Sequence, residues 1–123
     1  MLFPYKTVRL TKEDGGICRL TLSRPEVKNA LSRLVISEIT EAVMDVQEDV
    51  STRTLVIDHE GDIFCAGADL SDLSELNSRE EGLKYARLLF DLLDLIEKSS
   101  FPVVVTARGN IYGGGIGLLA AAD

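Results

Sequence analysis

From residue 31 onward, long segments with a helical pattern alternate with short segments that have a strand pattern. Residues 31–49 and 80–98 carry apolar side chains at intervals of three and four, which is the spacing of one helix face. Residues 53–60 and 101–108 are shorter and have apolar centres, as expected of buried strands. Strands that are joined by helices pair in parallel through right-handed crossovers. The pattern therefore predicts an α/β fold with a largely parallel sheet and flanking helices.

A β-hairpin is expected ahead of this α/β part. Residues 17–23 alternate apolar and polar side chains, which is typical of a half-buried strand. Gly15 and Gly16 precede them as a turn, and residues 5–10 are the expected partner strand. Pro25 then ends the second strand, because proline cannot donate to a central ladder. The predicted order is β-β-α-β-α-β-α, and 123 residues suffice for one domain.

Each long predicted helix has an apolar face that we expect to be buried. In the first helix the face consists of Ile36, Ile39, Val43, Val46 and Val50. In the second helix it consists of Leu83, Ala86, Phe90, Leu93 and Ile96, widened by Leu88, Leu92 and Leu95. A face this wide indicates burial on more than one side.

Composition and charge exclude several classes of function. The 20 acidic and 13 basic side chains give a net charge of −7, and an acidic surface repels phosphate backbones, so no nucleic-acid partner is expected. No apolar run reaches about 18 residues and no signal pattern opens the chain, so we expect no membrane partner and a cytoplasmic location. Cys18 and Cys65 lack metal-ligand spacing, which favours reduced thiols and no metal site. The single histidine, His59, is expected at the surface or in a loop rather than as a catalytic base.

Residues 61–73 are the first segment that could carry chemistry. They follow the carboxyl end of a predicted strand, where ligands gather in open α/β sheets. Ala66, Gly67 and Ala68 are small, so a ligand can approach the main chain there. Asp69 is a good cap for a short helix over residues 71–76. A tight strand-to-helix turn with a cap is the purely structural alternative.

Residues 109–123 are the second such segment, and they also follow a predicted strand. Gly113, Gly114 and Gly115 stand at the start of an apolar helix, where N–H groups lack partners and the helix dipole favours negative charge. Without a Cβ atom, these residues let a ligand atom touch the backbone. Close packing of helix on sheet is the structural alternative. Together, the two segments could direct two main-chain N–H groups at one oxygen, as in an oxyanion hole.

Three motifs, in this order and spacing, resemble the crotonase superfamily, which is the enoyl-CoA hydratase/isomerase family. They are LTLSRPEVKNALS (20–32), FCAGADL (64–70) and GNIYGGGIGLLAAAD (109–123). The resemblance extends over residues 17–123 and implies a spiral of ββα units. It also implies that the protein binds acyl thioesters, of coenzyme A or of an acyl carrier protein, and acts on them through an enolate.

By motif position, the resemblance implies that the N–H groups of Ala68 and Gly114 polarise the thioester carbonyl. Coenzyme A or phosphopantetheine enters as part of the substrate, and no separate cofactor is expected. The positions implied to bind the substrate are Val27, Lys28, Ala66, Asp69, Leu70 and Gly113.

The sequence departs from the family pattern at Gly117. Hydratases of this family carry a glutamate there, which works on the water, whereas glycine offers neither an acid nor a base. Hydration or dehydration, isomerisation and decarboxylation therefore all stay open. The glycine form most resembles the dehydratases that act on carrier-protein-tethered intermediates in polyketide assembly.

Length is the second departure, because family members extend well beyond the equivalent of residue 123. Asp123 is also expected at the unfavourable negative end of an uncapped apolar helix. We therefore expect residues 1–123 to be the N-terminal part of a single, truncated crotonase-like domain, whose full-length parent is a homo-oligomer, trimer or hexamer. A small complete protein, a non-catalytic thioester-binding or assembly module, and a generic α/β ligand-binding domain are the alternatives.

Overall fold

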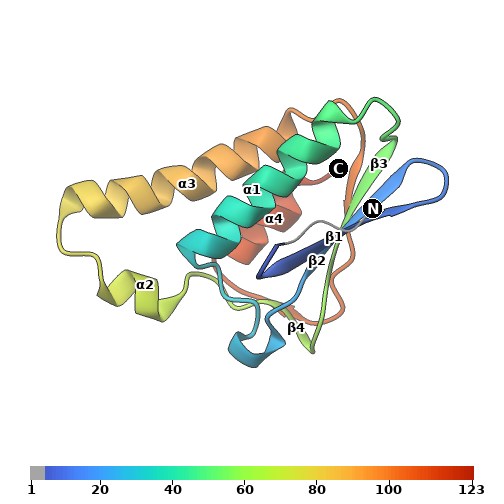
Figure 1. The fold of residues 1–123 in the computed structure, drawn as a ribbon. Helices are drawn as coiled ribbons and strands as arrows, with labels where there is room; N and C mark the ends of the chain where they lie inside the picture. The colour runs from blue at the N-terminus through green and yellow to red at the C-terminus, as the bar shows by residue number, and fades with distance from the viewer. Residues whose placement is uncertain (1–4) are drawn as a thin grey trace.

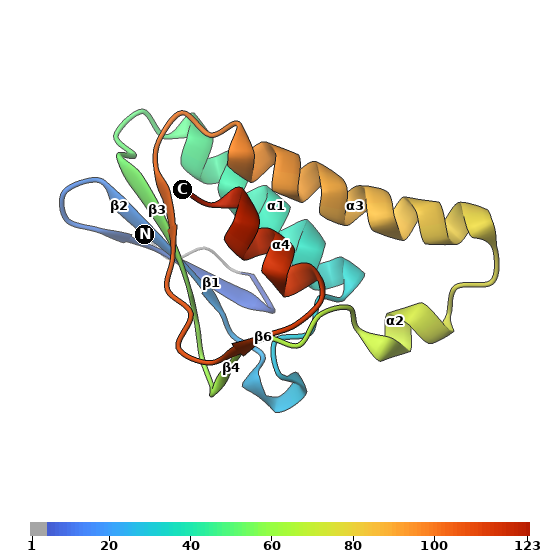
Figure 2. The same cartoon turned by 180° about the vertical axis from the view of Figure 1, so that it is seen from behind.

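The computed structural model describes residues 5–123 and has a four-stranded sheet with helices packed on one side (Figures 1 and 2). The strand order is β1-β2-β3-β5, in which β1 and β2 are antiparallel and the other pairs are parallel. The four strands are β1 (Val8–Glu13), β2 (Ile17–Leu22), β3 (Thr54–His59) and β5 (Val103–Val105). The predicted hairpin and the largely parallel α/β architecture are confirmed.

Three longer helices lie together beside this sheet (Figures 1 and 2). They are α1 (Arg33–Glu48), α3 (Arg79–Glu97) and α4 (Gly114–Ala121). Side-chain caps fix where two of them begin: the Ser32 hydroxyl accepts from the Val35 N–H at 3.1 Å, and the Ser78 hydroxyl accepts from the Glu81 N–H at 3.2 Å. Leu20, Ile36, Ile57 and Leu118 are buried where sheet and helices meet.

Two short strands that the sequence pattern did not reveal form a second, parallel sheet. These are β4 (Ile63–Cys65) and β6 (Asn110–Ile111), which follow β3 and β5 along the chain. Two short helical turns, η1 (Pro25–Val27) and α2 (Leu70–Ser74), complete the fold. The second sheet matters for function because it brings the ends of two distant segments side by side.

The buried faces of the two long helices differ from the sequence-based expectation. Val50 is fully exposed, because α1 ends at Glu48 and the chain then turns away. Phe90, in the second half of α3, is 61% exposed, and Leu83 is 60% exposed because the first half of α3 projects beyond the sheet (Figure 1). In that half of α3, Tyr85 is the buried residue.

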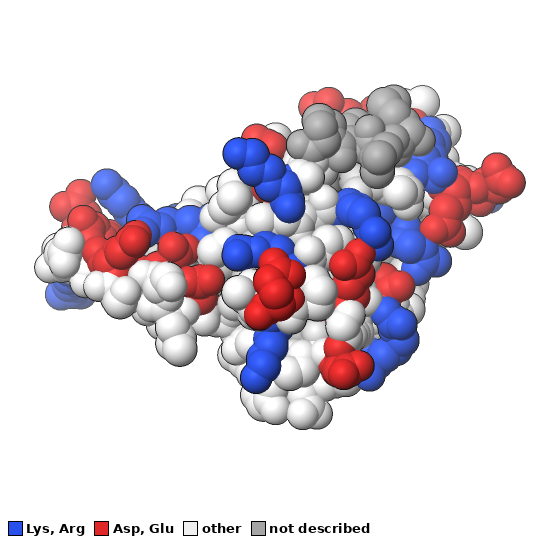
Figure 3. All heavy atoms as spheres, turned by 60° about the horizontal axis from the view of Figure 1, so that its bottom comes forward, with Lys and Arg blue, Asp and Glu red and all other residues white. Residues whose placement is uncertain are grey.

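Charged groups on the polar side of the sheet form ion pairs across strands. Arg19 on β2 and Arg108 both approach the Asp58 carboxylate, at 3.4 Å and 3.2 Å. Figure 3 shows positive and negative side chains interleaved over one face of the molecule rather than separated into patches. This surface therefore offers no broad basic field for a polyanion.

Asp123 lies outside the last helix, contrary to expectation. Helix α4 ends at Ala121, and the Asp123 carboxylate accepts from the Val103 N–H at 2.9 Å. The Asp123 N–H in turn donates to the Val103 carbonyl at 2.9 Å. The residue is therefore bound to strand β5 rather than placed at the negative end of a helix.

Glu38 connects helix α1 to Lys6 and Thr7, which precede β1, and this connection can be tested. Its side chain is 8% exposed and accepts from the Lys6 N–H at 2.9 Å, the Thr7 N–H at 2.7 Å and the Thr7 hydroxyl at 2.6 Å. Burial acts to raise the pKa of Glu38, but these donors lower it more, so the pKa lies below its ordinary 4.5. We expect Glu38→Gln to lower the free energy of unfolding by about 1–3 kcal/mol at pH 7, because the amide NH2 would face N–H donors.

The pH dependence follows from the lowered pKa. The stabilisation by ionised Glu38 is complete above the ordinary pKa and is lost as the pH falls through the lowered, folded-state value. Denaturant titrations from pH 7 to pH 3 should show the gap between wild type and Glu38→Gln closing in acid. Glu41→Gln, an exposed change on the same helix, is the control. A gap that stays constant with pH would contradict this assignment.

Candidate functional site

The two small-residue segments predicted from the sequence meet at the ends of β4 and β6. Because these strands are parallel, their carboxyl ends lie side by side, and the Tyr112 N–H donates to the Cys65 carbonyl at 2.9 Å. Gly67 and Gly113 then pack backbone against backbone. A Cβ atom on Gly113 would lie 3.2 Å from the Gly67 Cα and 4.0 Å from the Ala68 nitrogen.

The Ala68 N–H group faces away from the neighbouring chain segment. Leu31 forms a one-residue parallel bridge with Ala68, in which the Leu31 N–H donates to the Gly67 carbonyl at 2.7 Å. The Asp69 N–H completes the bridge by donating to the Leu31 carbonyl at 3.3 Å. The bridge uses the Gly67 carbonyl and the Asp69 N–H. The Ala68 N–H between them has no acceptor within residues 5–123.

The Gly114 N–H group is also without an acceptor in the described part of the chain. Gly114 is the first residue of α4, and Gly113 is its N-cap. The next two N–H groups are used locally: Gly115 donates to the Tyr112 carbonyl and Ile116 to the Gly113 carbonyl, each at 3.0 Å. The Gly113 N–H has no acceptor within residues 5–123 either. The two adjoining turns therefore leave several main-chain donors available, those of Ala68 and Gly114 among them, and such donors stabilise an oxygen that gains negative charge.

Most of the predicted binding residues share one surface hollow of about 350 Å³. Its lining residues are Val27, Ala30, Ala66, Ala68, Asp69, Leu70 and Ser71. Lys28 faces a neighbouring hollow of about 200 Å³ with Pro25 and Gly61, and its carbonyl accepts from the Ala66 N–H at 3.0 Å. Gly113 contacts Gly67 instead of lining either hollow. The binding roles of these residues stay predictions, although their positions form one continuous region.

Asp69 has a structural role in this region, as its residue type predicted. Its carboxylate caps α2 by accepting from the Asp72 N–H at 3.1 Å. The cap alternative is therefore correct for the side chain of Asp69, while the Ala68 N–H before it stays available.

Asn29 is a residue that the sequence analysis missed. It is buried with a positive φ of 53°, and its side chain accepts from the Arg24 N–H at 2.8 Å. The same side chain donates to the carbonyls of Glu60 and Ile63 at 3.0 Å and 3.1 Å. It thereby fixes the η1 segment against the turn before β4. The available signal was the residue type, since asparagine tolerates the left-handed region better than most residues.

Leucine side chains surround the start of α4. A Cβ atom on Gly114 would lie 2.9 Å from Leu89 and 3.0 Å from Leu31, and a Cβ atom on Gly117 would lie 2.8 Å from Leu93. Tyr85 on α3 donates its hydroxyl to the Leu31 carbonyl, and burial raises its pKa. Helix α3 therefore packs leucine side chains against the Cα positions of Gly114 and Gly117.

His59 is buried, so the expected surface position was wrong. Its side chain is 1% exposed, and its Nε2 atom accepts from the Arg108 N–H at 2.9 Å. The ring also packs edge-on against Phe64, with 5.4 Å between the centroids. Because Nε2 already accepts a hydrogen bond from the main chain, His59 joins the end of β3 to the segment that follows β5 and does not present this nitrogen as a base.

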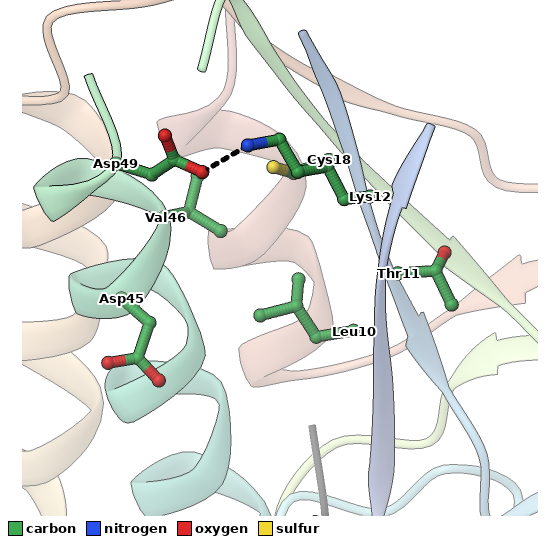
Figure 4. A pocket seen from close by; sticks show the side chains of 7 residues that line it. All are labelled: Leu10, Thr11, Lys12, Cys18, Asp45, Val46 and Asp49. Carbon is green, nitrogen blue, oxygen red and sulfur yellow. Dashed lines mark hydrogen bonds and ion pairs between the residues drawn. The ribbon is translucent and has the colours of Figure 1, made fainter. Parts of the chain in front are cut away.

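A separate cavity of about 60 Å³ lies between the hairpin and the end of α1 (Figure 4). Lys12 and Asp49, which line it, form an ion pair, and none of its lining residues belongs to the predicted site. Residues 5–123 contain no cluster of His, Cys, Asp or Glu that could hold a metal ion. No helix in that range is long and apolar enough to cross a bilayer.

Comparisons with known proteins point in one direction. Residues 12–123 match the family model described as enoyl-CoA hydratase/isomerase. The chain is 30% identical to the mitochondrial Delta(3,5)-Delta(2,4)-dienoyl-CoA isomerase of Mus musculus, covering 97% of this chain and 39% of that protein. It is 32% identical to the mitochondrial enoyl-CoA hydratase domain-containing protein 2 of Homo sapiens, covering 93% of this chain and 39% of that protein.

The fold is similar to solved structures as well. An enoyl-CoA hydratase of Mycobacterium smegmatis superposes with a TM-score of 0.92 at 31% identity, over 96% of this chain and 46% of that chain. The expected crotonase-like fold is thus confirmed for the described residues. The chain spans less than half the length of these relatives.

The contact between Gly67 and Gly113 can be tested by adding a single methyl group. Gly113 has φ +51° and ψ −127°, which side chains rarely adopt, so we expect Gly113→Ala to lower the free energy of unfolding by about 1–3 kcal/mol. Gly82→Ala is the control, because it lies within α3 with open space around it and should stabilise by about 0.5–1 kcal/mol. Thermal denaturation compares the two, and equal stabilities would contradict the close backbone approach.

Proposed function

Because this chain belongs to the enoyl-CoA hydratase/isomerase family, we propose that it binds an acyl thioester and polarises its carbonyl through the main chain. The Ala68 and Gly114 N–H groups donate to the thioester oxygen. The observation that carries this proposal is that both amides lack an acceptor within residues 5–123, on turns that touch at Gly67 and Gly113.

The chemistry follows from where negative charge develops. Removing a proton or a carboxylate group from the carbon next to a thioester carbonyl moves an electron pair onto the carbonyl oxygen, which gives an enolate. Two fixed N–H donors stabilise that oxygen more strongly as its charge grows, and this difference lowers the barrier. Leu31 and Leu89, which contact the Gly114 position, limit the water that would otherwise screen the interaction.

The rest of the ligand lies along the hollow beside Ala68. Val27 and Leu70 offer apolar surface to a pantetheine arm, and Lys28 offers a positive charge next to it. Coenzyme A and a carrier-protein phosphopantetheine share this arm, so either thioester fits the proposal. The carrier group belongs to the substrate, and we propose no separate cofactor.

We propose that the reaction passes through an enolate, which hydration or dehydration, isomerisation and decarboxylation have in common. The relatives include an isomerase and a protein named for a hydratase domain. Because Gly117 has no side chain and packs against Leu93, another residue must supply the catalytic acid or base. We propose a crotonase-type lyase or isomerase for the whole protein, which acts as a homo-oligomer in the cytoplasm.

A non-catalytic thioester-binding or assembly module is the second candidate. The leucines around Gly114 and Gly117 favour it, because the position that carries glutamate in hydratases has hydrocarbon beside it here. Calorimetric titration with acetyl-CoA tests what both candidates share, and we expect binding. Turnover of crotonyl-CoA, or deuterium exchange at the acyl Cα of acetyl-CoA, then distinguishes the enzyme from the module. If acetyl-CoA does not bind at millimolar concentration, both candidates fail.

A matched pair of variants tests the Gly114 amide. Gly114→Pro and Gly114→Ala both place a Cβ atom against Leu89 and Leu31, but only proline removes the N–H. Proline also suits the first position of a helix, so α4 should persist. We expect the rate of Cα deuterium exchange in Gly114→Pro to fall about 10²–10³-fold below that of Gly114→Ala, with binding of free coenzyme A retained in both. Equal exchange rates would remove Gly114 from the proposal.

A further inference from the structure

We infer that Cys65 is the positioning residue that sets the Ala68 and Gly114 amides relative to each other, an inference that rests on the proposed function. Cys65 is the last residue of β4 and is 0% exposed. It therefore touches no substrate, and its influence on the reaction passes through the two turns that it contacts.

Cys65 holds the first turn through its side chain. The Gly67 N–H donates to the Cys65 Sγ atom at 3.4 Å, which closes the turn immediately before Ala68. Gly67 has a φ of +90°, so the turn needs this support at a point where the backbone is unusually free. The direction of the next N–H group, that of Ala68, depends on how this turn is closed.

Cys65 also holds the second turn, from the other side. Its carbonyl accepts from the Tyr112 N–H, two residues before Gly114. A Cβ atom on Gly115 would lie 2.6 Å from the Cys65 Cβ and 3.0 Å from its Sγ, so the first turn of α4 rests directly on this side chain. Cys65 thus contacts both Gly67, which precedes Ala68, and Gly115, which follows Gly114.

The chemistry of the thiol suits this role better than nucleophilic attack. Burial raises the pKa of Cys65, while the Gly67 N–H acts in the opposite direction, and the net result keeps the thiol neutral. A neutral sulfur accepts a hydrogen bond and fills the space under Gly115 without placing a charge behind the two amides. Serine keeps the acceptor in a smaller volume, whereas alanine removes the acceptor and leaves a gap.

Two readouts test the inference, and the first requires no ligand. In ¹H–¹⁵N spectra of the free protein, Cys65→Ala should shift the amide signals of both Ala68 and Gly114, and Cys65→Ser should shift them less. Cys18→Ala is the matched control, because Cys18 is a buried thiol on β2 next to Thr52, outside both turns. A shift confined to one of the two amides, or equal shifts in the Cys18 control, would overturn the inference.

The second readout measures carbonyl polarisation with acetyl-CoA labelled with ¹³C at the thioester carbonyl. Wild type should move the carbonyl stretch to lower frequency. In Cys65→Ala, the frequency shift should be smaller and the Cα exchange rate about 10–10²-fold lower than in wild type, while free coenzyme A binds as before. Cys65→Ser should recover most of both effects. If Cys65→Ala keeps the wild-type carbonyl frequency and exchange rate, this inference fails and the proposed function stands. If the carbonyl frequency does not change in wild type, the proposed function fails, and the ¹H–¹⁵N amide signals alone decide the positioning role of Cys65.

Discussion

The backbone contact between Gly67 and Gly113 is the constraint on which the candidate site depends. Both residues have positive φ, and each would bring a Cβ atom to within 3.2–3.4 Å of the other's Cα. Parallel pairing of β4 with β6 delivers the two turns to this point, and Leu31 and Cys65 then fix their orientation. The available amides of Ala68 and Gly114 directly follow the two contacting glycines.

The sequence predicted the elements that depend on local periodicity and on residue type. The hairpin, the three longer helices, the Asp69 cap and the two glycine- or alanine-rich turns were all visible in this way. The pairing of β4 and β6 was not visible, because strands of two or three residues carry no period. The exposure of Phe90 and the burial of His59 also escaped prediction, because both depend on which elements lie nearby and not on the local pattern.

A main-chain N–H donor does not depend on the identity of its own side chain. The similar proteins include both an isomerase and a protein named for a hydratase domain. An amide can be presented by any residue whose turn is held in place, and the fold itself is retained at 31% identity with a TM-score of 0.92. The requirements fall instead on residues that shape the backbone, such as Asn29 with its three hydrogen bonds.

The bonds between Asp123 and Val103 have a consequence for association between molecules. Within residues 5–123, β5 is an edge strand of the larger sheet, and the Val103 N–H and carbonyl face away from β3. Unpaired groups on a sheet edge are a template for adding a foreign strand. Asp123 saturates both groups of Val103, so a neighbouring molecule could extend the sheet there only by first displacing that carboxylate.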